Sequence, residues 1–272
     1  MTPQLFAPPE ALKSFIKYFW ALNNPVESPP KTLSAFPDGC PGIIMVQSEG
    51  GAICDNLNKK LPGIYLHGQT IAPSKLSCSG KFSAVGVSFQ PHALKSVFGI
   101  DACEFTHAGF DLNSIQNKKH INLSEQIINE ESVEGKIKML SNYLLYRHQT
   151  NDRQTEDMIK DAVAQIVQSK GNLSLKELQQ KLNLSERSLE RKFNQSIGIS
   201  PKLFSRICRF QESLNQLQTR SYDKLSDIAY ENQYADQSHL IRTFKEFTGL
   251  SPLEFKKQSG GLVDNLSQLA RE

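Results

Sequence analysis

A repeated segment near the end of the chain constrains its fold more than any other feature. The run RKFNQSIGISPKLF, residues 191–204, returns as RTFKEFTGLSPLEF, residues 242–255, after a shift of 51 positions. Seven positions are identical when one leucine pair just upstream is included: Leu189 and Leu240, Arg191 and Arg242, Phe193 and Phe244, Gly198 and Gly249, Ser200 and Ser251, Pro201 and Pro252, and Phe204 and Phe255. We therefore expect two copies of one structural unit.

Each copy predicts one helix that ends and another that begins. A glycine follows the apolar end of the first helix, and Ser-Pro opens the next helical run. Shorter amphipathic helices are expected upstream, at residues 175–182 and 225–232, and a polar turn leads from each to an N-cap at Ser185 or Asp236. The predicted order in each copy is helix, tight turn, helix.

This order suits DNA recognition, because the major groove of a duplex is about 12 Å wide and accepts one α-helix. In both copies the exposed face of the second helix carries side chains that bond to bases or phosphates. We predict DNA contacts from Ser185, Arg187, Ser188, Glu190, Arg191, Gln237, Ser238, His239 and Arg242. The alternative is the solvated outer face of a helical bundle. Duplication favours DNA, because two such faces can enter successive grooves roughly 34 Å apart.

The charge distribution agrees with a DNA-binding C-terminal part. Residues 171–258 contain 14 Lys and Arg against 10 Asp and Glu, a net charge of +4. Residues 1–170 contain 16 of each sign and are neutral. The basic surplus therefore lies in the repeat region, where attraction to phosphates requires it, and its small size predicts a salt-sensitive complex.

Over residues 172–257 the chain resembles the AraC/XylS transcription regulators. The resemblance rests on the paired helix-turn-helix units, the repeated Arg-x-Phe and Gly-x-Ser-Pro motifs, and the Arg209-Phe210 pair between the copies. It implies that residues 186–197 and 237–248 are the two recognition helices. It also implies double-stranded DNA as a partner, contact with RNA polymerase, and a homodimer.

Three positions depart from the family pattern. Asn183 and Gln233 occupy turn positions where the family usually has glycine, and asparagine tolerates a left-handed backbone better than glutamine does. Gln179 stands where alanine is common, so the first unit is expected to pack less tightly.

Residues 1–121 follow a β-rich pattern. An aromatic helix is expected at residues 12–22, and Gly-containing and Pro-containing turns separate strands expected at residues 31–36, 42–47, 51–55, 63–68, 75–79 and 82–89. A small sandwich or barrel is typical of such spacing. The stretches AFPDGCPGIIM and GVSFQP also resemble the cupin-like N-terminal domain of one branch of these regulators.

The expected architecture is therefore an α+β protein of two domains. We expect a β-rich sensing or dimerisation domain at 1–121, a helical linker at 122–153, the DNA-binding domain at 154–258 and a tail at 259–272. The helical pattern at residues 132–146 suits either coupling and dimer contact or an intramolecular core helix.

A β-module of this size can hold one small molecule, which makes it a candidate effector sensor. Polar and aromatic residues near expected strand ends are ligand candidates, although each also suits a turn, cap or core role: Phe36, Asp38, His67, Gln69, Phe89 and His92. A module that only dimerises, which leaves DNA binding constitutive, is the alternative.

The sequence predicts no enzyme, no cofactor and no metal site. Cupin enzymes require a His-x-His pair among their metal ligands, and no such pair occurs in the chain. The five cysteines form no Cys-x-x-Cys motif. Five thiols without a secretory signal or a long apolar span predict a cytoplasmic protein that does not contact membranes. A cupin-like enzyme with an appended helical domain is the rival function.

Overall fold

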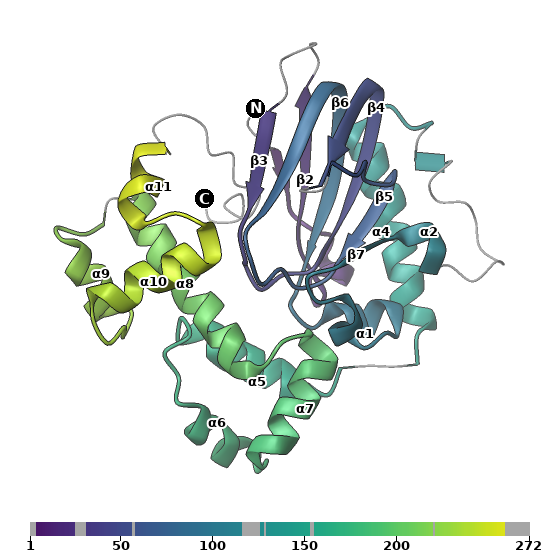
Figure 1. Cartoon of the computed structure of the whole chain (residues 1–272). Helices are drawn as coiled ribbons and strands as arrows, with labels where there is room; N and C mark the ends of the chain where they lie inside the picture. Colours follow the sequence, from purple (N-terminus) through teal and green to yellow (C-terminus); the bar gives the residue numbers. More distant parts are fainter. Residues whose placement is uncertain are drawn as a thin grey trace.

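A β-sheet forms the N-terminal half of the protein and helices form the C-terminal half (Figure 1). The computed structural model describes residues 4–24, 31–55, 58–115, 126–127, 129–152, 155–219 and 221–258. The predicted α+β architecture is confirmed. The expected tail at 259–272 lies outside the described residues.

The strands form one antiparallel sheet. Their bounds are β1 (Gln4–Phe6), β2 (Ile16–Asn24), β3 (Lys31–Ala35), β4 (Gly42–Cys54), β5 (Ile64–His67), β6 (Ser74–Phe89) and β7 (Gly109–Asp111). The order is β1-β2-β6-β4-β5-β7, and β3 also pairs with β6. The first half of β6 pairs with β3 and its second half pairs with β2, while β4 runs along its other side. The two long strands therefore connect all parts of the sheet.

The sequence prediction divided β4 and β6 into two strands each, and both divisions are wrong. In β4 the expected turn is a bulge, because Glu49 and Gly50 both face Lys81 and the strand continues beyond them. In β6 the backbone at Gly80 has a φ of +66° but does not reverse. Glycine allows a strand to bend at a bulge or kink, so glycine alone does not predict a turn.

The predicted aromatic helix at residues 12–22 is also wrong. A short 3-10 helix η1 (Glu10–Leu12) and a turn at residues 13–15 precede β2, which occupies residues 16–22 of this segment. Tyr18 and Trp20 lie in the cluster on one face of the sheet, and Phe19 and Ala21 lie in the cluster on the other face. A strand buried on both faces has a continuous apolar sequence, which also contains the spacing typical of a helix.

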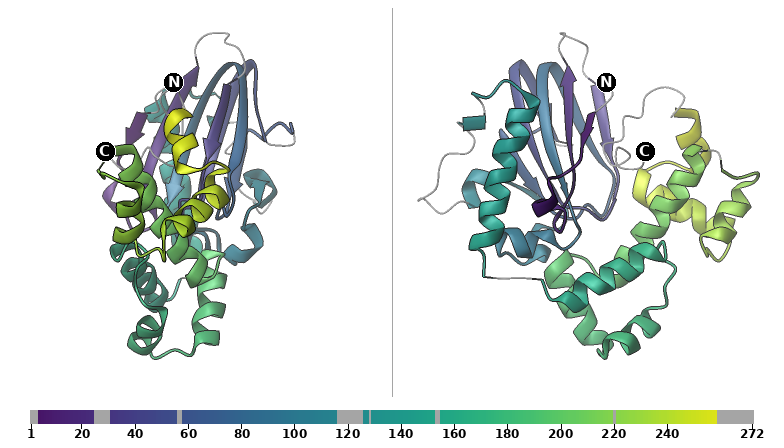
Figure 2. Two further views of the ribbon diagram at one scale, coloured as in Figure 1. Left: turned by 60° about the vertical axis from the view of Figure 1, so that its left-hand side comes forward. Right: turned by 180° about the vertical axis from the view of Figure 1, so that it is seen from behind.

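Helices cover one face of the sheet. Among them, α1 (Ala93–Phe98) and α4 (Val133–Thr150) pack on the core that contains Phe19, and Figure 2 shows α4 running alongside the strands of the sheet. Leu140 and Leu144 of α4 are fully buried. Of the two roles considered for this segment, the structure shows the intramolecular core helix. Two further short helices, η2 (Ala102–Phe105) and α2 (Leu112–Ile115), flank β7.

Seven described helices form the C-terminal half. Their bounds are α5 (Asp157–Gln168), α6 (Leu175–Leu182), α7 (Glu186–Ile197), α8 (Pro201–Thr219), α9 (Leu225–Glu231), α10 (Gln237–Thr248) and α11 (Pro252–Gln258). They share one core, in which α8 connects the two repeated units (Figure 1). The Phe210 ring of α8 lies 5.4 Å from Phe244 and 5.1 Å from Phe247, centroid to centroid. The phenylalanines that are identical in the two copies are all buried in this core: Phe193, Phe204, Phe244 and Phe255.

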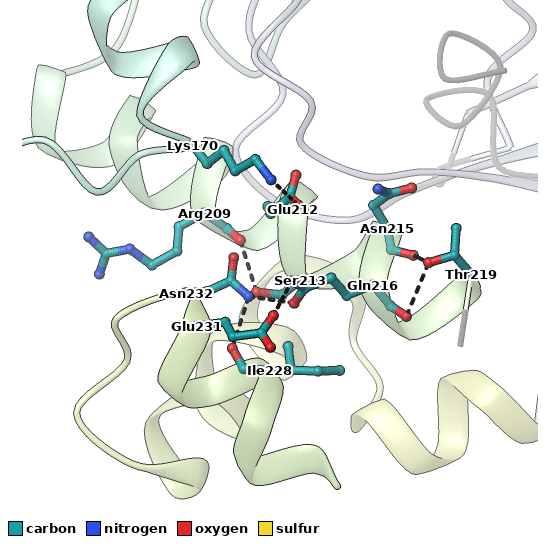
Figure 3. A network of polar contacts seen from close by, with 10 residues as sticks. All are labelled: Lys170, Arg209, Glu212, Ser213, Asn215, Gln216, Thr219, Ile228, Glu231 and Asn232. Carbon is teal, nitrogen blue, oxygen red and sulfur yellow. Dashed lines mark hydrogen bonds and ion pairs between the residues drawn. The ribbon is translucent and has the colours of Figure 1, made fainter. Parts of the chain in front are cut away.

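A polar network fixes the second unit on α8 (Figure 3). Gln216 Nε2 donates to Glu231 Oε2 at 2.8 Å, and Gln216 Oε1 accepts from Asn232 Nδ2 at 2.7 Å. Asn232 Nδ2 also donates to the Ile228 carbonyl at 2.9 Å. Because Asn232 is buried, these bonds satisfy an amide that would otherwise be costly to desolvate. The network therefore holds the end of α9 against the connecting helix.

Candidate nucleic-acid interface and ligand cavity

The two predicted recognition helices begin at the predicted caps. Ser185 Oγ accepts a hydrogen bond from the Ser188 amide at 3.3 Å, before α7. Asp236 Oδ1 accepts from the His239 amide at 2.7 Å, before α10. Both helices end at a left-handed glycine, Gly198 with a φ of +96° or Gly249 with +76°. The duplicated sequence signals therefore produce duplicated local structure.

The turns before these helices also adopt the same backbone conformation. Asn183 has a φ of +51° and Gln233 has a φ of +54°, in the left-handed region that glycine adopts without steric cost. For a residue with a β-carbon, this backbone conformation costs about 1–2 kcal/mol of conformational free energy.

Replacing Gln233 by glycine should raise the free energy of unfolding by about 0.5–1 kcal/mol, because the left-handed strain exceeds the added flexibility of the unfolded chain. The measurement is urea unfolding of the full chain. The matched variant Asn183→Gly should gain less, since asparagine tolerates this conformation. A lower urea midpoint for Gln233→Gly would contradict the expectation.

Three arginines lie on the exposed faces of the recognition helices. Arg187 and Arg191 of α7 and Arg242 of α10 are exposed. No hydrogen bond or ion pair engages their guanidinium groups within the part of the chain that the structure describes. By contrast, Lys192 on the inner side of α7 pairs with Glu156 at 2.6 Å. The donors of these three arginines are therefore available to an external partner.

The other predicted DNA contacts divide into exposed and partly engaged residues. Glu190, Gln237 and Ser238 are exposed, as are the three arginines. The Ser185 hydroxyl caps α7 and donates to Ser188 Oγ at 3.1 Å. The half-buried His239 ring accepts from the Ala235 amide at Nδ1, so its neutral form carries the proton on Nε2. It retains one donor for a phosphate or a base.

On the face of the sheet opposite α4 lies a cavity of about 280 Å³. Three aromatic side chains of its wall lie over glycines of neighbouring strands. A β-carbon at Gly86 would collide with the Trp20 indole, and one at Gly109 would collide with the Tyr65 phenol. A β-carbon at Gly42 would lie 2.6 Å from His67 Nε2. These glycines let the three rings approach the backbone.

Acidic and neutral polar groups occupy the same cavity wall. Asp38 Oδ1 accepts from the Cys40 amide at 2.9 Å, and burial raises the pKa of this carboxyl against the opposing attraction of the Lys17 ammonium. Burial lowers the pKa of His67, whose Nδ1 lies 3.2 Å from the Gly68 carbonyl. In the neutral ring Nδ1 donates and Nε2 is left as an acceptor. Burial also raises the pKa of the Cys40 thiol to about 11, so it stays uncharged.

Three of the six predicted ligand residues line this cavity: Phe36, Asp38 and His67. Gln69 is fully buried beside it, where its Nε2 donates to the Gly39 carbonyl at 2.9 Å. Phe89 and His92 are not among the described residues that line the cavity.

Strand alternation explains why Phe89 lies outside the cavity. Ser88 faces the cavity, so Phe89 faces the opposite core. His92 lies next to α1, with Nε2 3.2 Å from the Ser14 carbonyl, and burial lowers its pKa to about 4.

Sequence reasoning missed most of the aromatic and acidic wall. The cavity is also lined by Tyr18, Trp20, Asp55, Tyr65 and His107. The alternation of Tyr18 and Trp20 would have placed them on one face if their segment had been recognised as a strand. Asp55 and His107 follow no local pattern that indicates a cavity.

The cavity wall is also a contact between the two halves of the molecule. Phe36 is buried in the helical core, with its ring 5.8 Å from that of Phe255. Gln211 Nε2 of α8 donates to the Pro37 carbonyl at 2.6 Å. A β-carbon at Gly39 would lie 2.8 Å from the Phe204 ring. Residues 36–41, here called the wall segment, therefore connect the cavity to α8 and α11.

A second contact joins the N-terminal half to the first repeated unit. Thr106 Oγ1, next to η2, donates to the carbonyl of Gly198 at the end of α7. The N-terminal half thus contacts the end of α7 next to η2, and contacts α8 and α11 through the wall segment.

The residues that the structure describes contain no group of three or more His, Cys, Asp or Glu side chains placed to hold a metal ion. No described helix has the length and apolar character needed to cross a membrane.

Comparisons with known proteins match the two halves separately. A family model described as a helix-turn-helix domain matches residues 178–258, and one described as a domain of unknown function, DUF6597, matches residues 4–111. No protein with a curated description matches the chain.

Several solved structures are similar at low identity. ToxT from Vibrio cholerae is 12% identical over 88% of this chain and 97% of that chain, with a TM-score of 0.45. The C-terminal domain of AraT, a response regulator from Geobacillus stearothermophilus, is 23% identical over 39% and 88%, with a TM-score of 0.36. The AraC-like transcriptional activator CuxR is 11% identical over 79% and 86%, with a TM-score of 0.27.

Proposed function

We propose that this chain is an AraC-type DNA-binding transcription regulator and that α7 and α10 enter adjacent major grooves of one duplex. The observation that carries this proposal is the equivalence of the two repeated units. Arg191 and Arg242 share one repeat position, are both exposed, and have no partner within the described chain. Each is suited to bond a guanine edge or a phosphate.

The connecting helix has a length that suits this geometry. α8 contains 19 residues, or about 28 Å of helix. Successive major grooves on one side of a duplex lie roughly 34 Å apart. The Phe210 contacts and the Gln216 network hold the second unit on α8. The two recognition helices are therefore held at a nearly fixed distance and orientation. A bipartite operator is therefore expected.

In this proposal, residues 1–121 form a sensor, residues 154–258 form the DNA-binding domain, and the helical segment between them includes α4. A molecule in the cavity would touch the wall segment, which contacts α8 and α11 on its other side. Binding would change how firmly the sheet domain holds the two units. A coupling of about 1–3 kcal/mol changes DNA affinity roughly 5-fold to 150-fold.

The remaining partners are proposed from the family alone. AraC-type regulators recruit RNA polymerase and often act as homodimers, and both are expected of this chain. No catalytic activity is assigned to the cavity.

The proposal is tested by selecting bound sequences from a random duplex library with the full chain, followed by a salt titration on the selected duplex. Enrichment of two short boxes about one helical turn apart is expected. Affinity should fall as salt rises, because phosphate contacts release counterions. Weak, salt-sensitive binding without enriched sequences would contradict recognition by paired helices.

A further inference from the structure

We propose that the cavity binds a small organic cation, namely a protonated amine attached to an aromatic or other flat ring. The inference rests on the proposed sensor role and names the chemical class of its effector. It is carried by the charges, the aromatic surfaces and the size of the cavity.

The charged side chains that line the cavity favour a cation. Asp38 and Asp55 line the cavity, whereas none of its described lining residues is lysine or arginine. The Lys17 ammonium attracts Asp38 and lies 3.7 Å from Cys40 Sγ, but Lys17 is exposed and is not among the residues that line the cavity. A carboxylate or phosphate ligand would therefore lose its water beside two acidic side chains, without a lining cation to replace it. An ammonium group would gain from the same surroundings.

Hydrogen-bonding capacity points in the same direction. Neutral His67 offers Nε2 as an acceptor, and the Asp38 carboxyl has a second oxygen besides the one bound to the Cys40 amide. An ammonium group supplies up to three donors. Acceptors on the wall thus match donors on the ligand.

Aromatic rings supply the remaining surface. Tyr18, Trp20 and Tyr65 line the cavity, and Trp20 and Tyr65 are seated against glycine backbone. Aromatic faces attract cations through the ring quadrupole and stack with flat ligand rings. Aliphatic Ile44, Leu61 and Leu76 complete the apolar part.

Size limits the ligand. A cavity of about 150 Å³ holds one benzene molecule. The volume here is about 280 Å³, which is enough for roughly ten to fifteen non-hydrogen atoms on the same scale. Tryptamine is of this size, and tryptophol and indole-3-propionate present the same ring with a neutral or an anionic group.

The test measures binding of these three probes to the full chain by isothermal titration calorimetry. Tryptamine is expected to bind at least ten times more tightly than tryptophol, and indole-3-propionate is expected to bind more weakly still. Equal or tighter binding of the propionate, or no binding of tryptamine, would overturn the proposal.

Variants locate the site. Asp38→Asn should weaken tryptamine binding at least ten-fold, and it keeps the Oδ1 acceptor that the Cys40 amide requires. Asp55→Asn should weaken it in the same direction. The control Glu10→Gln removes one exposed charge outside the cavity and should change nothing. Undiminished tryptamine binding by Asp38→Asn and Asp55→Asn would place the probe elsewhere and refute the proposal.

DNA binding separates this inference from the proposed function. Each variant is also titrated with the selected duplex in the absence of probe. If the chain selects a duplex but binds no amine, the ligand class is wrong and the regulator function stands. If no duplex is selected, the regulator function itself fails, whatever the probes do.

Discussion

Replacing Arg191 and Arg242 together by alanine is expected to weaken binding of the selected duplex by about 2–6 kcal/mol, roughly 30-fold to 20,000-fold. Each arginine that bonds a base edge is expected to contribute about 1–3 kcal/mol. Both side chains occupy one repeat position, are exposed, and have no partner in the described chain. Their loss should leave the fold intact. Fluorescence anisotropy with labelled duplexes measures the effect.

The single variants identify the contact that each arginine makes. An arginine on a base edge should lose affinity only for duplexes with the preferred base at one position. An arginine on a phosphate should lose affinity for all duplexes and lower the salt dependence by about one unit. Lys192→Ala is the matched control, because Lys192 lies on α7 but pairs with Glu156. Wild-type affinity in the double variant would exclude both arginines from the interface.

The sequence predicted the C-terminal half well because its signals are local. Ser185 and Asp236 cap the helices that follow them, and Gly198 and Gly249 end those helices. Each signal acts within one helical turn, so no knowledge of distant partners is needed. The turn at Gln233 was also identified, although glutamine is an unusual residue for its left-handed backbone. Whether the predicted DNA contacts touch DNA stays a prediction.

The N-terminal half was harder because its strands depend on distant partners. β2 pairs with β6, more than sixty residues later, for example Trp20 with Gly86. Nothing local distinguishes such a doubly buried strand from a buried helix. Because this strand was predicted as a helix, Tyr18 and Trp20 were not identified as residues that line the cavity. Phe36, Asp38 and His67 were found because they lie next to correctly predicted strand ends.

The wall segment contains a residue, Phe36, for which the sequence indicated one role and the structure shows a second. Phe36 was proposed as a ligand contact, and it lines the cavity. Its ring is also buried in the core of the other domain, against Phe255. No pattern in the sequence relates positions 36 and 255, because this contact depends on how the two domains dock.

Replacing Phe36 by alanine is therefore expected to weaken the contact between the two domains, so that they unfold independently. Truncating a buried phenylalanine costs about 3–5 kcal/mol, and Phe36 is only 4% exposed. Because the partners of Phe36 belong to the helical domain, much of this cost should be a loss of free energy of interaction between the two domains. Differential scanning calorimetry should show two separate transitions, where the wild type unfolds with its domains coupled. A tryptamine response of DNA binding, if present in the wild type, should be lost.

Phe89→Ala is the matched control for this variant. Phe89 is fully buried in the core on the opposite face of the sheet, so its truncation should cost a similar amount within the N-terminal domain. It leaves the wall segment and its contacts with α8 and α11 in place. The domains should therefore stay coupled, and the response to a ligand should persist at a lower melting temperature. If Phe36→Ala and Phe89→Ala behave alike, the wall segment does not transmit a signal, and the hydrogen bonds from Thr106 to the Gly198 carbonyl and from Thr155 to the His92 carbonyl become the next contacts between the domains to test.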